Sequence, residues 1–368
     1  MYPYHLKAYL DIFQNEPATP LRPSSSILVH IYLSLTEYPG DKLMKMQKAL
    51  LSLCLSSATL LFTHGVSAQT LKAADVHPQG YPNVVAVQHM GEKLQKQTDG
   101  RLEIKTFPGG VLGDEKQEIE QAQLGALDII RVSMTPVASI LPEINVFTLP
   151  YIFRDEDHMH KVLDGQIGKE IGDKITSNPN SRLVFLGWMD GGTRNLITKK
   201  PVVKPEDLHG MKIRVQGSPI ALATLKAMGA NPVAMGVSEV FSGMQTGVID
   251  GTENNPPTFV AHNYLPVVKN YTYSRHFIIP ELFLYSKVKW DKLKPEDQQL
   301  ILKLAKEAQD EQRELWKAYN EKALATMKAG GVQFYEIDPA TYVKATQSVR
   351  DEFGKDHQDL MQQIADVK

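Results

Sequence analysis

The sequence contains a single cysteine, Cys54, among its 368 residues. One cysteine cannot form a disulfide within the chain, and it cannot supply a Cys/His zinc site. Neither sign of charge is in excess, because the formal net charge is only −2. Composition therefore gives no reason to expect nucleic acid or an anionic membrane surface as a partner. The 42% apolar content is enough for a large core in one or two domains.

The common catalytic motifs are missing too. The sequence has no G-x-S-x-G followed by an acid and a histidine, no phosphate-binding P-loop, no H-E-x-x-H and no cysteine nucleophile. His158 and His160 are two residues apart, so they do not share a helix face as metal ligands at i and i+4 would. We therefore expect a chain that is not an enzyme and that uses no metal and no cofactor.

The N-terminal 68 residues resemble a leader rather than part of a folded domain. Residues 44–48 are basic, residues 49–62 are apolar, and Val66-Ser67-Ala68 places small residues at the cleavage positions. This pattern predicts a secretory signal peptide over 44–68, with a membrane anchor as the alternative. Residues 1–43 have little periodicity, and we predict a non-native or disordered extension. The mature chain, from 69 onward, would lie in the periplasm and lack cysteine, which suits an oxidising compartment.

Strand-like and helix-like segments alternate in the same order in two halves of the mature chain. The first half has predicted strands at 71–76, 102–107 and 127–134, with helices at 82–98 and from 115 onward. The second half has predicted strands at 211–215, 231–235 and 248–251, with helices at 220–228 and up to 247. This order is typical of open α/β sheets, in which ligands bind beyond the carboxyl ends of the strands. The pattern predicts an α/β fold with two lobes.

Three further segments complete the prediction. Residues 295–328 have apolar side chains at the spacing of one face of a long helix. A strand at 332–337 and a helix at 339–364 end the chain. Residues 277–285 are predicted to form one apolar strand that carries an acid, Glu281, and a buried acid needs an ionic or hydrogen-bonding partner.

The stretch from 208 to 256 has the most specific pattern. It contains KIRVQGSP, then MGANPVAM, then SEVFSGMQTGVIDGTENN, and SRHF follows at 274–277. In this order and spacing, these segments resemble the extracytoplasmic solute-binding proteins of TRAP transporters, the DctP family. The resemblance extends from about His77 to the C-terminus, which is nearly all of the predicted mature chain.

The resemblance implies an architecture and partners. It implies a two-lobed fold like that of periplasmic binding proteins, with a ligand cleft between the lobes, connecting strands and one long bracing helix. We expect lobe I to comprise 69–191 plus about 280–319, and lobe II to comprise 192–279 plus about 320–368. The protein partners would be the small and large permease subunits in the membrane. The family is mostly monomeric, with some dimers.

The resemblance also implies the binding residues. Arg214 aligns with the arginine that holds the ligand carboxylate, Arg194 with a second arginine, and Asn254 with the asparagine of the family's E-N motif. Arginine suits this role because its planar guanidinium donates two hydrogen bonds to one carboxylate. Without the resemblance, both arginines would pass as solvated side chains. Alignment with acidic-sugar binders places four residues at or near the pocket: Glu115, Ser133, His276 and Glu281. His77, at the end of the first predicted strand, and Asn255, directly after Asn254, complete this second set, which is expected to contact hydroxyls.

The second set predicts what kind of acid is bound. Carboxylates and amides form hydrogen bonds with vicinal hydroxyls, whereas an alkyl dicarboxylate would leave Glu115 and Glu281 buried without partners. We therefore expect a uronate such as glucuronate or galacturonate. Val237 stands where sialate binders carry an aromatic residue, which argues against sialate. The alternatives are another organic acid (2,3-diketogulonate, an aldonate or a C4 dicarboxylate), a sensory periplasmic module, and a secreted enzyme acting on sugar acids.

Overall fold

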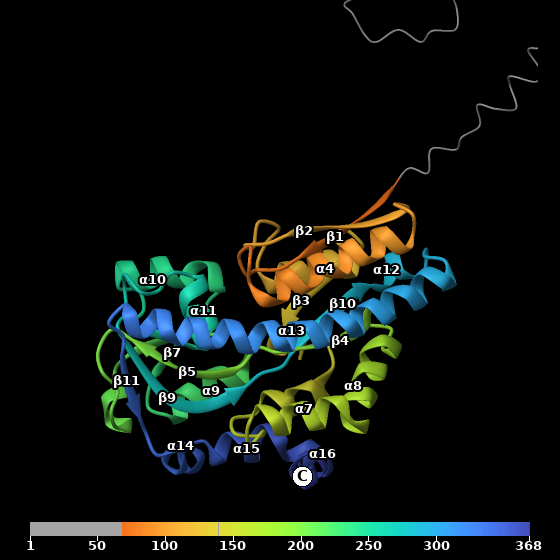
Figure 1. Cartoon of the computed structure of the whole chain (residues 1–368). Coiled ribbons are helices and arrows are strands. Elements are labelled where there is room, and N and C mark those ends of the chain that lie inside the picture. Colours follow the sequence, from red (N-terminus) through yellow and green to blue (C-terminus); the bar gives the residue numbers. More distant parts are fainter. Residues whose placement is uncertain (1–67, 139) are drawn as a thin grey trace, which may run out of the picture. The chain divides into compact units, whose positions relative to one another are not determined.

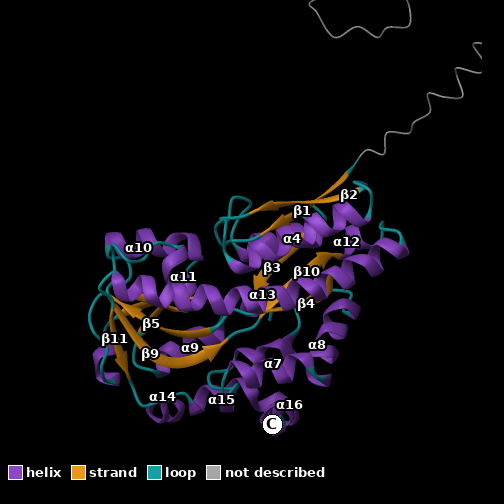
Figure 2. Ribbon diagram, viewed as in Figure 1, coloured by secondary structure: helices purple, strands orange, loops and turns teal. Residues whose placement is uncertain are grey.

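The computed structural model describes residues 68–138 and 140–368. The predicted extension over 1–43 and nearly all of the predicted signal peptide lie outside the described residues. Within the described ranges, no helix combines the length and the apolar character needed to cross a membrane. The predicted α/β class is confirmed, because the described chain folds into two sheets with helices packed around them (Figures 1 and 2).

The first sheet has five strands in the order β2-β1-β3-β10-β4. Its strands β2, β1 and β3 are parallel, and β10 runs antiparallel to its neighbours β3 and β4. Three strands come from the first predicted β-α-β-α-β half, whereas β10 comes from much later in the chain. The strands are β1 (Gln69–Ala74), β2 (Leu102–Phe107), β3 (Ile129–Ser133), β4 (Leu183–Met189) and β10 (Glu281–Ser286).

The second sheet has six strands in the order β11-β9-β5-β8-β6-β7. Strands β6, β7 and β8 are the second predicted half and are parallel, whereas β5 runs antiparallel to both of its neighbours, β8 and β9. The strands are β5 (Thr193–Thr198), β6 (Lys212–Val215), β7 (Asn231–Ala234), β8 (Gly251–Asn254), β9 (Asn270–Ile278) and β11 (Gln333–Glu336).

The helices include the crossovers that parallel strands require. The α-helices are α4 (Pro82–Gln97), α5 (Glu115–Leu124), α6 (Met134–Val137), α7 (Glu156–Asp164), α8 (Gln166–Ser177), α9 (Pro219–Ala227), α10 (Val240–Thr246), α11 (Pro256–Ala261), α12 (Lys287–Trp290), α13 (Pro295–Ala329), α14 (Pro339–Ala345), α15 (Gln347–Gly354) and α16 (Gln358–Asp366). The 3-10 turns are η2 (Pro142–Thr148), η3 (Pro205–Leu208), η4 (Val237–Glu239) and η5 (Lys355–His357).

Two short connections join the sheets, and one of them corrects a prediction. The single strand predicted at 277–285 is wrong, because β9 ends at Ile278 in the second sheet and β10 begins at Glu281 in the first. Pro280 lies between them and has no N–H to donate, so it suits a break in strand pairing. The other connection runs beside it: Met189 pairs with Glu281, and Thr193 pairs with Ile278.

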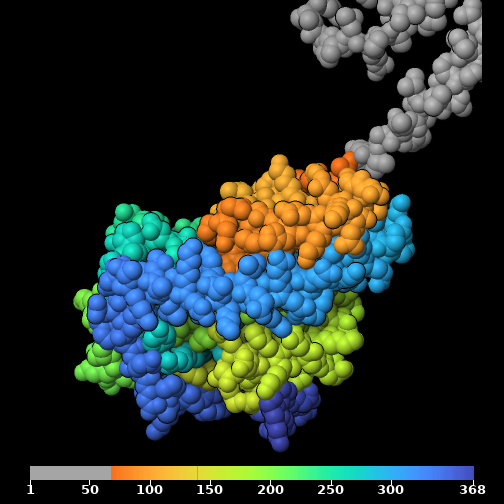
Figure 3. Space-filling view, in the orientation of Figure 1, coloured from red at the N-terminus to blue at the C-terminus, as the bar shows by residue number. Residues whose placement is uncertain are grey.

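The long helix α13 has the predicted length but a more polar buried face. It packs against α4 and β4 and, further along, against α11, and it crosses the visible face of the molecule as one blue band (Figure 3). Its Gln309 accepts a hydrogen bond from the backbone N–H of Trp188 at 3.0 Å, and Gln312 accepts one from Asp190 at 2.9 Å. Strand β4 lies at the edge of its sheet, so these glutamines satisfy backbone groups that no neighbouring strand reaches.

The helix predicted at 339–364 is wrong, because the segment forms α14, α15 and α16 separated by breaks. At the first break the Thr346 hydroxyl donates to the Tyr342 carbonyl at 2.7 Å and accepts from Arg350 at 2.9 Å. Such side-chain bonds to nearby backbone compete with helical ones. The apolar periodicity continues through the breaks, so the pattern alone does not reveal them.

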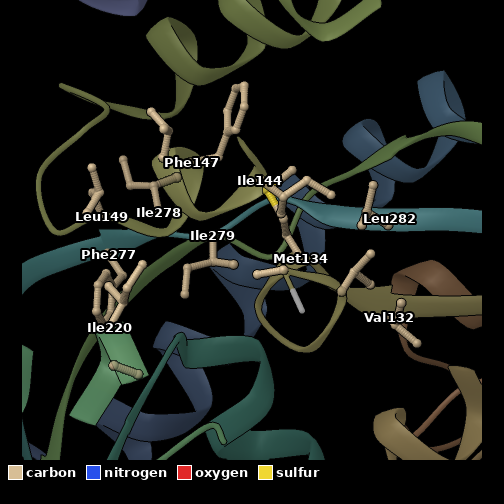
Figure 4. Close-up of a cluster of buried hydrophobic side chains, with 14 of the residues drawn as sticks. Val132, Met134, Ile144, Phe147, Leu149, Ile220, Phe277, Ile278, Ile279 and Leu282 are labelled. Atoms are coloured by element: carbon tan, nitrogen blue, oxygen red, sulfur yellow. The ribbon is translucent and has the colours of Figure 1, made fainter. Parts of the chain in front are cut away.

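An apolar core spans the place where the chain passes between the sheets. It joins side chains from the first sheet and η2 to side chains from β9 and α9 of the second (Figure 4). The labelled members are Val132, Met134, Ile144, Phe147, Leu149, Ile220, Phe277, Ile278, Ile279 and Leu282. The connections are therefore packed rather than solvated, and they place the strand ends of both sheets around one cleft.

Candidate ligand-binding cleft

A cleft of about 770 Å³ lies at the strand ends of both sheets. The loops after β1, β2, β3, β6 and β7 contribute to its lining, as expected for the carboxyl ends of strands in an open α/β sheet. The cleft collects most of the predicted site residues. Those in the lining are His77, Glu115, Arg194, Arg214, Asn254, Asn255 and Glu281.

Arg214, on β6, is a buried cation without a carboxylate partner. Its side chain is 3% exposed, and Nε and Nη2 both donate to the carbonyl of Met235, at 2.9 and 2.7 Å. Among the described residues, no carboxylate lies within ion-pair distance of it, and its Nη1 makes no hydrogen bond. Burial lowers the pKa of Arg214 below its ordinary 12.5, and the charge of Arg194 adds to the decrease, because Tyr264, Glu253 and Glu115 offset it only in part. Arg214 therefore lines the cleft with one nitrogen, Nη1, that has no hydrogen-bond partner among the described residues.

Arg194, on β5, is by contrast fully paired. Its Nε and Nη2 donate to the Glu253 carboxylate at 2.6 and 2.7 Å, and its Nη1 donates to Asn254 Oδ1 at 3.2 Å. Burial alone would raise the pKa of Glu253, but Arg194 and His276 beside it lower this pKa to about 2. Glu253 thus neutralises Arg194, and the arginine is left to orient Asn254.

The two asparagines after Glu253 have different neighbours. Asn254 Oδ1 accepts from Arg194 and from the Asn255 backbone N–H at 2.9 Å, so its Nδ2 is the end left to donate. Asn255 is occupied at both ends, because Nδ2 donates to the Gly191 carbonyl at 2.6 Å and Oδ1 caps α11 by accepting from Thr258 at 2.7 Å. We call Arg194, Arg214 and Asn254, which all lie on the second sheet, the donor wall.

The strand predicted at 248–251 lies three residues too early. Strand β8 runs from Gly251 to Asn254, so the E-N motif lies on the strand itself. The cause is tertiary: β8 pairs with β5, with Asn254 opposite Asn195. Strand β5 was not predicted, and Arg194 lies on it rather than in a loop.

Two carboxylates face the donor wall in the lining of the cleft, Glu281 at the start of β10 and Glu115 at the start of α5, and we call them the acceptor wall. Glu115 Oε1 accepts from the Ser133 backbone N–H at 2.8 Å, and Glu281 Oε2 accepts from Arg131 at 2.5 Å. Gly191 makes room for Glu281, since a Cβ at that position would lie 2.5 Å from its Oε1. Burial raises the pKa of Glu281 to about 7, with Glu115 adding to the rise and Arg131 opposing it.

His77 also lines the cleft, at the end of β1. Its Nδ1 lies 3.0 Å from Asp75 and 2.5 Å from Arg131, and its ring stacks on Tyr81 with 3.9 Å between centroids. Burial and the Arg131 charge lower the pKa of His77, so the ring is neutral near pH 7. A neutral ring can exchange hydrogen bonds with a hydroxyl.

Ser133 and His276 are not in the cleft lining. The Ser133 hydroxyl lies 3.5 Å from Gln216, and its backbone N–H supports Glu115. His276 is fully buried, accepts or donates at Nδ1 with the Ser274 hydroxyl at 2.8 Å, and has Nε2 3.5 Å from Glu253. Their direct contact with a ligand stays a prediction.

Four polar residues of this region were missed by the sequence analysis: Asp75, Arg131, Gln216 and Glu253. Arg131 had a usable signal, because it lies within the apolar strand segment IIRVS, and a charge there is as unusual as Glu281. Glu253 and Asp75 stand next to residues that were considered, and only their contacts distinguish them. Gln216 has no sequence signal.

Several hydrogen bonds connect the two sheets across the cleft. Ser238 donates to Asp114 at 2.9 Å, and Gln216 lies 3.5 Å from Glu115. Away from these loops, the Tyr81 hydroxyl lies 3.2 Å from that of Thr258. Elements of both sheets are therefore in direct contact around the cleft.

A family model for bacterial extracellular solute-binding proteins, family 7 (DctP), matches residues 73–360. The chain belongs to this family. Its predicted membership is confirmed, and the family is one of solute-binding proteins rather than enzymes. A solute-binding protein of Chromohalobacter salexigens is 33% identical to this DctP-family chain over 324 residues, which are 86% of this chain and 96% of that protein.

Solved structures of relatives extend the comparison to conformation. A TRAP periplasmic solute-binding protein from Citrobacter koseri with bound D-glucuronate is 78% identical, with a TM-score of 0.80 over 82% of this chain and 100% of that one. The apo, open structure from the same organism gives 76% identity and 0.73 over 81% and 98%. A relative from Pseudomonas putida F1 with bound D-glucuronate gives 50% identity and 0.80 over 82% and 98%. This DctP-family chain is thus more similar in shape to the liganded relatives than to the open one.

Proposed function

We propose that this chain is the periplasmic solute-binding protein of a TRAP transporter and that it captures a uronate, D-glucuronate first. The observation that carries the proposal is Arg214, a cleft-lining guanidinium with a free donor and no carboxylate partner among the described residues. An unpaired buried cation is costly for a fold, so it points to a ligand that brings the missing negative charge. The glucuronate bound by two of the relatives is such a ligand.

The donor wall holds the ligand carboxylate. Arg214 Nη1 and Asn254 Nδ2 supply two donors, and Arg194 contributes by fixing the Asn254 amide. Charge-assisted hydrogen bonds of this kind are roughly twice as strong as neutral ones. Closure of the cleft shields the ion pair from water and so strengthens it further.

The acceptor wall binds the sugar hydroxyls. Glu281 Oε1 has no hydrogen-bond partner among the described residues, and Glu115 Oε2 has only the 3.5 Å contact with Gln216, so both can accept from a hydroxyl; neutral His77 lies beside them. A dicarboxylate would bring a second negative charge to this wall, where it would be repelled. A uronate satisfies both walls, because it carries one carboxylate and several hydroxyls.

The mechanism is capture by domain closure. The ligand binds the donor wall and acceptor wall together, which only the closed arrangement brings within reach of one small molecule. A ligand shifts the population toward the closed state to the extent that it binds that state better. The contacts between Asp114 and Ser238, and the similarity to liganded relatives, support this arrangement.

The cellular setting and domain boundaries follow from the same proposal. The signal peptide over 44–68 directs the chain to the periplasm, where the closed form delivers its ligand to the small and large permease subunits. We expect a monomer, with a dimer as the alternative. Lobe I (69–191 plus about 280–319) contains all strands of the first sheet, and lobe II (192–279 plus about 320–368) contains all strands of the second.

Thermal unfolding with a panel of acids tests the proposal. A ligand that binds only the folded protein raises the midpoint by mass action, and 100 times its Kd stabilises by about 2.7 kcal/mol, or roughly 5–10 °C here. We expect D-glucuronate or D-galacturonate to produce this rise. A rise with only succinate or 2,3-diketogulonate would show that the ligand is an organic acid other than a uronate. No rise with any acid would favour a sensory module. Recovery of the uronate chemically unchanged after long incubation distinguishes capture from turnover.

A further inference from the structure

Arg131, on β3, lies behind the acceptor wall and does not line the cleft. It is 1% exposed, and its guanidinium contacts four side chains. Nη1 donates to Glu281 at 2.5 Å and to Glu115 at 3.2 Å. Nε donates to Asp75 at 3.0 Å, Nη2 donates to the same carboxylate, and Nη2 also lies 2.5 Å from His77 Nδ1.

Three of these four partners line the cleft, and all three are predicted hydroxyl contacts: His77, Glu115 and Glu281. The fourth, Asp75, does not line the cleft, and its two carboxylate oxygens each accept a hydrogen bond from Arg131. One rigid guanidinium thus joins residues from β10, from the start of α5 and from the loop after β1. These segments are far apart in the sequence, and no other described cation contacts both Glu115 and Glu281.

The position of Arg131 also affects whether the two carboxylates of the acceptor wall can lie close together. Glu281 is buried and Glu115 beside it is partly buried, and the two carboxylates would repel one another without a cation between them. A guanidinium has its donors in a fixed fork, so it holds two carboxylates at a defined spacing, which a flexible ammonium cannot do as well. Each glutamate keeps one oxygen on Arg131 and the other directed elsewhere.

We propose that Arg131 is a positioning residue for ligand specificity: it fixes Glu115, Glu281 and His77 in the geometry that reads the hydroxyls of the sugar acid. The inference rests on the proposed function, since it concerns the same cleft. It makes discrimination among acids a property of a residue that does not touch the ligand. Arg214 provides affinity for the carboxylate, and Arg131 decides which carboxylates are accepted.

A chemical double-mutant cycle on Arg131→Lys tests this role. Affinities for D-glucuronate and for its 2-, 3- and 4-deoxy analogues are measured by calorimetry on the mature protein purified from the periplasm. In the wild type, removing a hydroxyl that bonds a charged acceptor should weaken binding by roughly 10- to 100-fold. In R131K we expect this penalty to fall below about threefold at the same position, because the acceptor is no longer held in place.

A purely structural role for Arg131 would give a different result. Loss of fold stability lowers the melting temperature but leaves the ratio between glucuronate and its deoxy analogue unchanged. Arg101→Lys is the matched control, since Arg101 also forms a two-pronged pair with a carboxylate, Asp297, away from the cleft. R101K should keep the wild-type penalties. Unchanged penalties in folded R131K would overturn the inference.

Asp75→Asn keeps the inference testable if R131K does not fold. It loosens the anchor of Arg131 while leaving Glu115, Glu281 and the donor wall in place, and it should shrink the deoxy penalties in the same way. Wild-type penalties in D75N would overturn the inference. Failure of the wild-type protein to bind glucuronate or galacturonate is a separate outcome, which overturns the proposed function first.

Discussion

The two walls of the cleft use the same residue type, arginine, in opposite ways. Arg214 in the donor wall has no carboxylate partner among the described residues, whereas Arg131 behind the acceptor wall contacts Asp75, Glu115 and Glu281. Arg194 is intermediate, since Glu253 balances it. The number of carboxylates around a buried arginine therefore indicates its role: none for binding an anion, one for orienting a neighbour, three for holding acceptors in place.

The difference has an energetic meaning. A buried charge without a partner destabilises the free protein, and it persists where function requires it. Before a ligand binds, the donor wall therefore carries one positive charge, that of Arg214, which no neighbouring carboxylate pairs with among the described residues. The acceptor wall has more carboxylates than cations around it, and the pKa of Glu281 is raised first by its burial and then by the neighbouring carboxylates Glu115 and Asp75.

The largest effect is expected from Arg214→Met, which removes the unpaired charge. Loss of one partner from a buried ion pair costs about 3–5 kcal/mol, so uronate binding should weaken by roughly 100- to 1,000-fold or more. The ligand-free protein should melt at the same temperature as the wild type or higher, because an uncompensated buried charge is gone. Calorimetry with D-glucuronate and thermal unfolding without ligand measure the two quantities.

Arg101→Met is the control for that experiment. Arg101 is paired with Asp297 and does not line the cleft, so its removal should lower the melting temperature and leave uronate affinity intact. The contrast between a paired and an unpaired arginine would break down if R214M bound glucuronate within tenfold of the wild type.

The second effect concerns the proton on the acceptor wall. Folded Glu281 keeps its proton up to about pH 7, whereas in the unfolded chain it titrates near its ordinary pKa of 4.5. The folded state therefore binds more protons between these values, and this group's contribution to stability falls as the pH rises from 4.5 to 7. The free energy of unfolding of Glu281→Gln, relative to that of the wild type, should therefore rise by up to about 3 kcal/mol between pH 4.5 and pH 7. It should not rise further above pH 7.

Glu118→Gln is the matched variant outside the cleft. Glu118 on α5 is fully buried, neither of its oxygens has a hydrogen-bond partner among the described residues, and burial raises its pKa to about 9. The free energy of unfolding of Glu118→Gln, relative to that of the wild type, should keep rising between pH 7 and pH 9. Its uronate affinity should be unchanged. Denaturant unfolding at a series of pH values separates the two windows, and coincident curves would refute the assignment to Glu281.

The smallest effects are expected for substitutions near the contact between Asp114 and Ser238, where loops from the two sheets meet beside the cleft. A Cβ on Gly236, beside η4, would overlap the Asp114 carboxylate, although the local backbone suits any residue. Gly236→Ala should weaken uronate binding by about 3- to 10-fold by disfavouring closure, without changing the melting temperature of the free protein.

Ser238→Ala removes only the hydrogen bond to Asp114, which is exposed, and should weaken binding by about twofold. Ser242→Ala on the neighbouring helix is its control, since that hydroxyl bonds only the Glu239 carbonyl. Calorimetric titration with glucuronate compares the three variants. Full affinity in Gly236→Ala would show that Asp114 moves aside without consequence for closure.

The sequence predicted most elements well where a local pattern defines them. Helices α4 and α13 and strand β2 lie within one or two residues of their predicted bounds, because periodicity and flanking Gly or Pro mark them. The errors share a cause. Strand β5, the start of β8 and the break between β9 and β10 depend on which strand lies alongside, which no local pattern contains.

The sequence by itself determined the family, the α/β class and most of the polar residues that line the cleft, because local patterns and one long motif specify them. Only the tertiary structure decided what each polar residue does. In the sequence, Arg131, Arg194 and Arg214 look alike, because each is an arginine within a strand. Their roles differ because folding places different side chains beside them, and those side chains are 16 to 150 residues away in the sequence, such as Glu115, Glu253 and Glu281. Charge acts through space, so a buried arginine's function depends on the carboxylates that folding brings beside it.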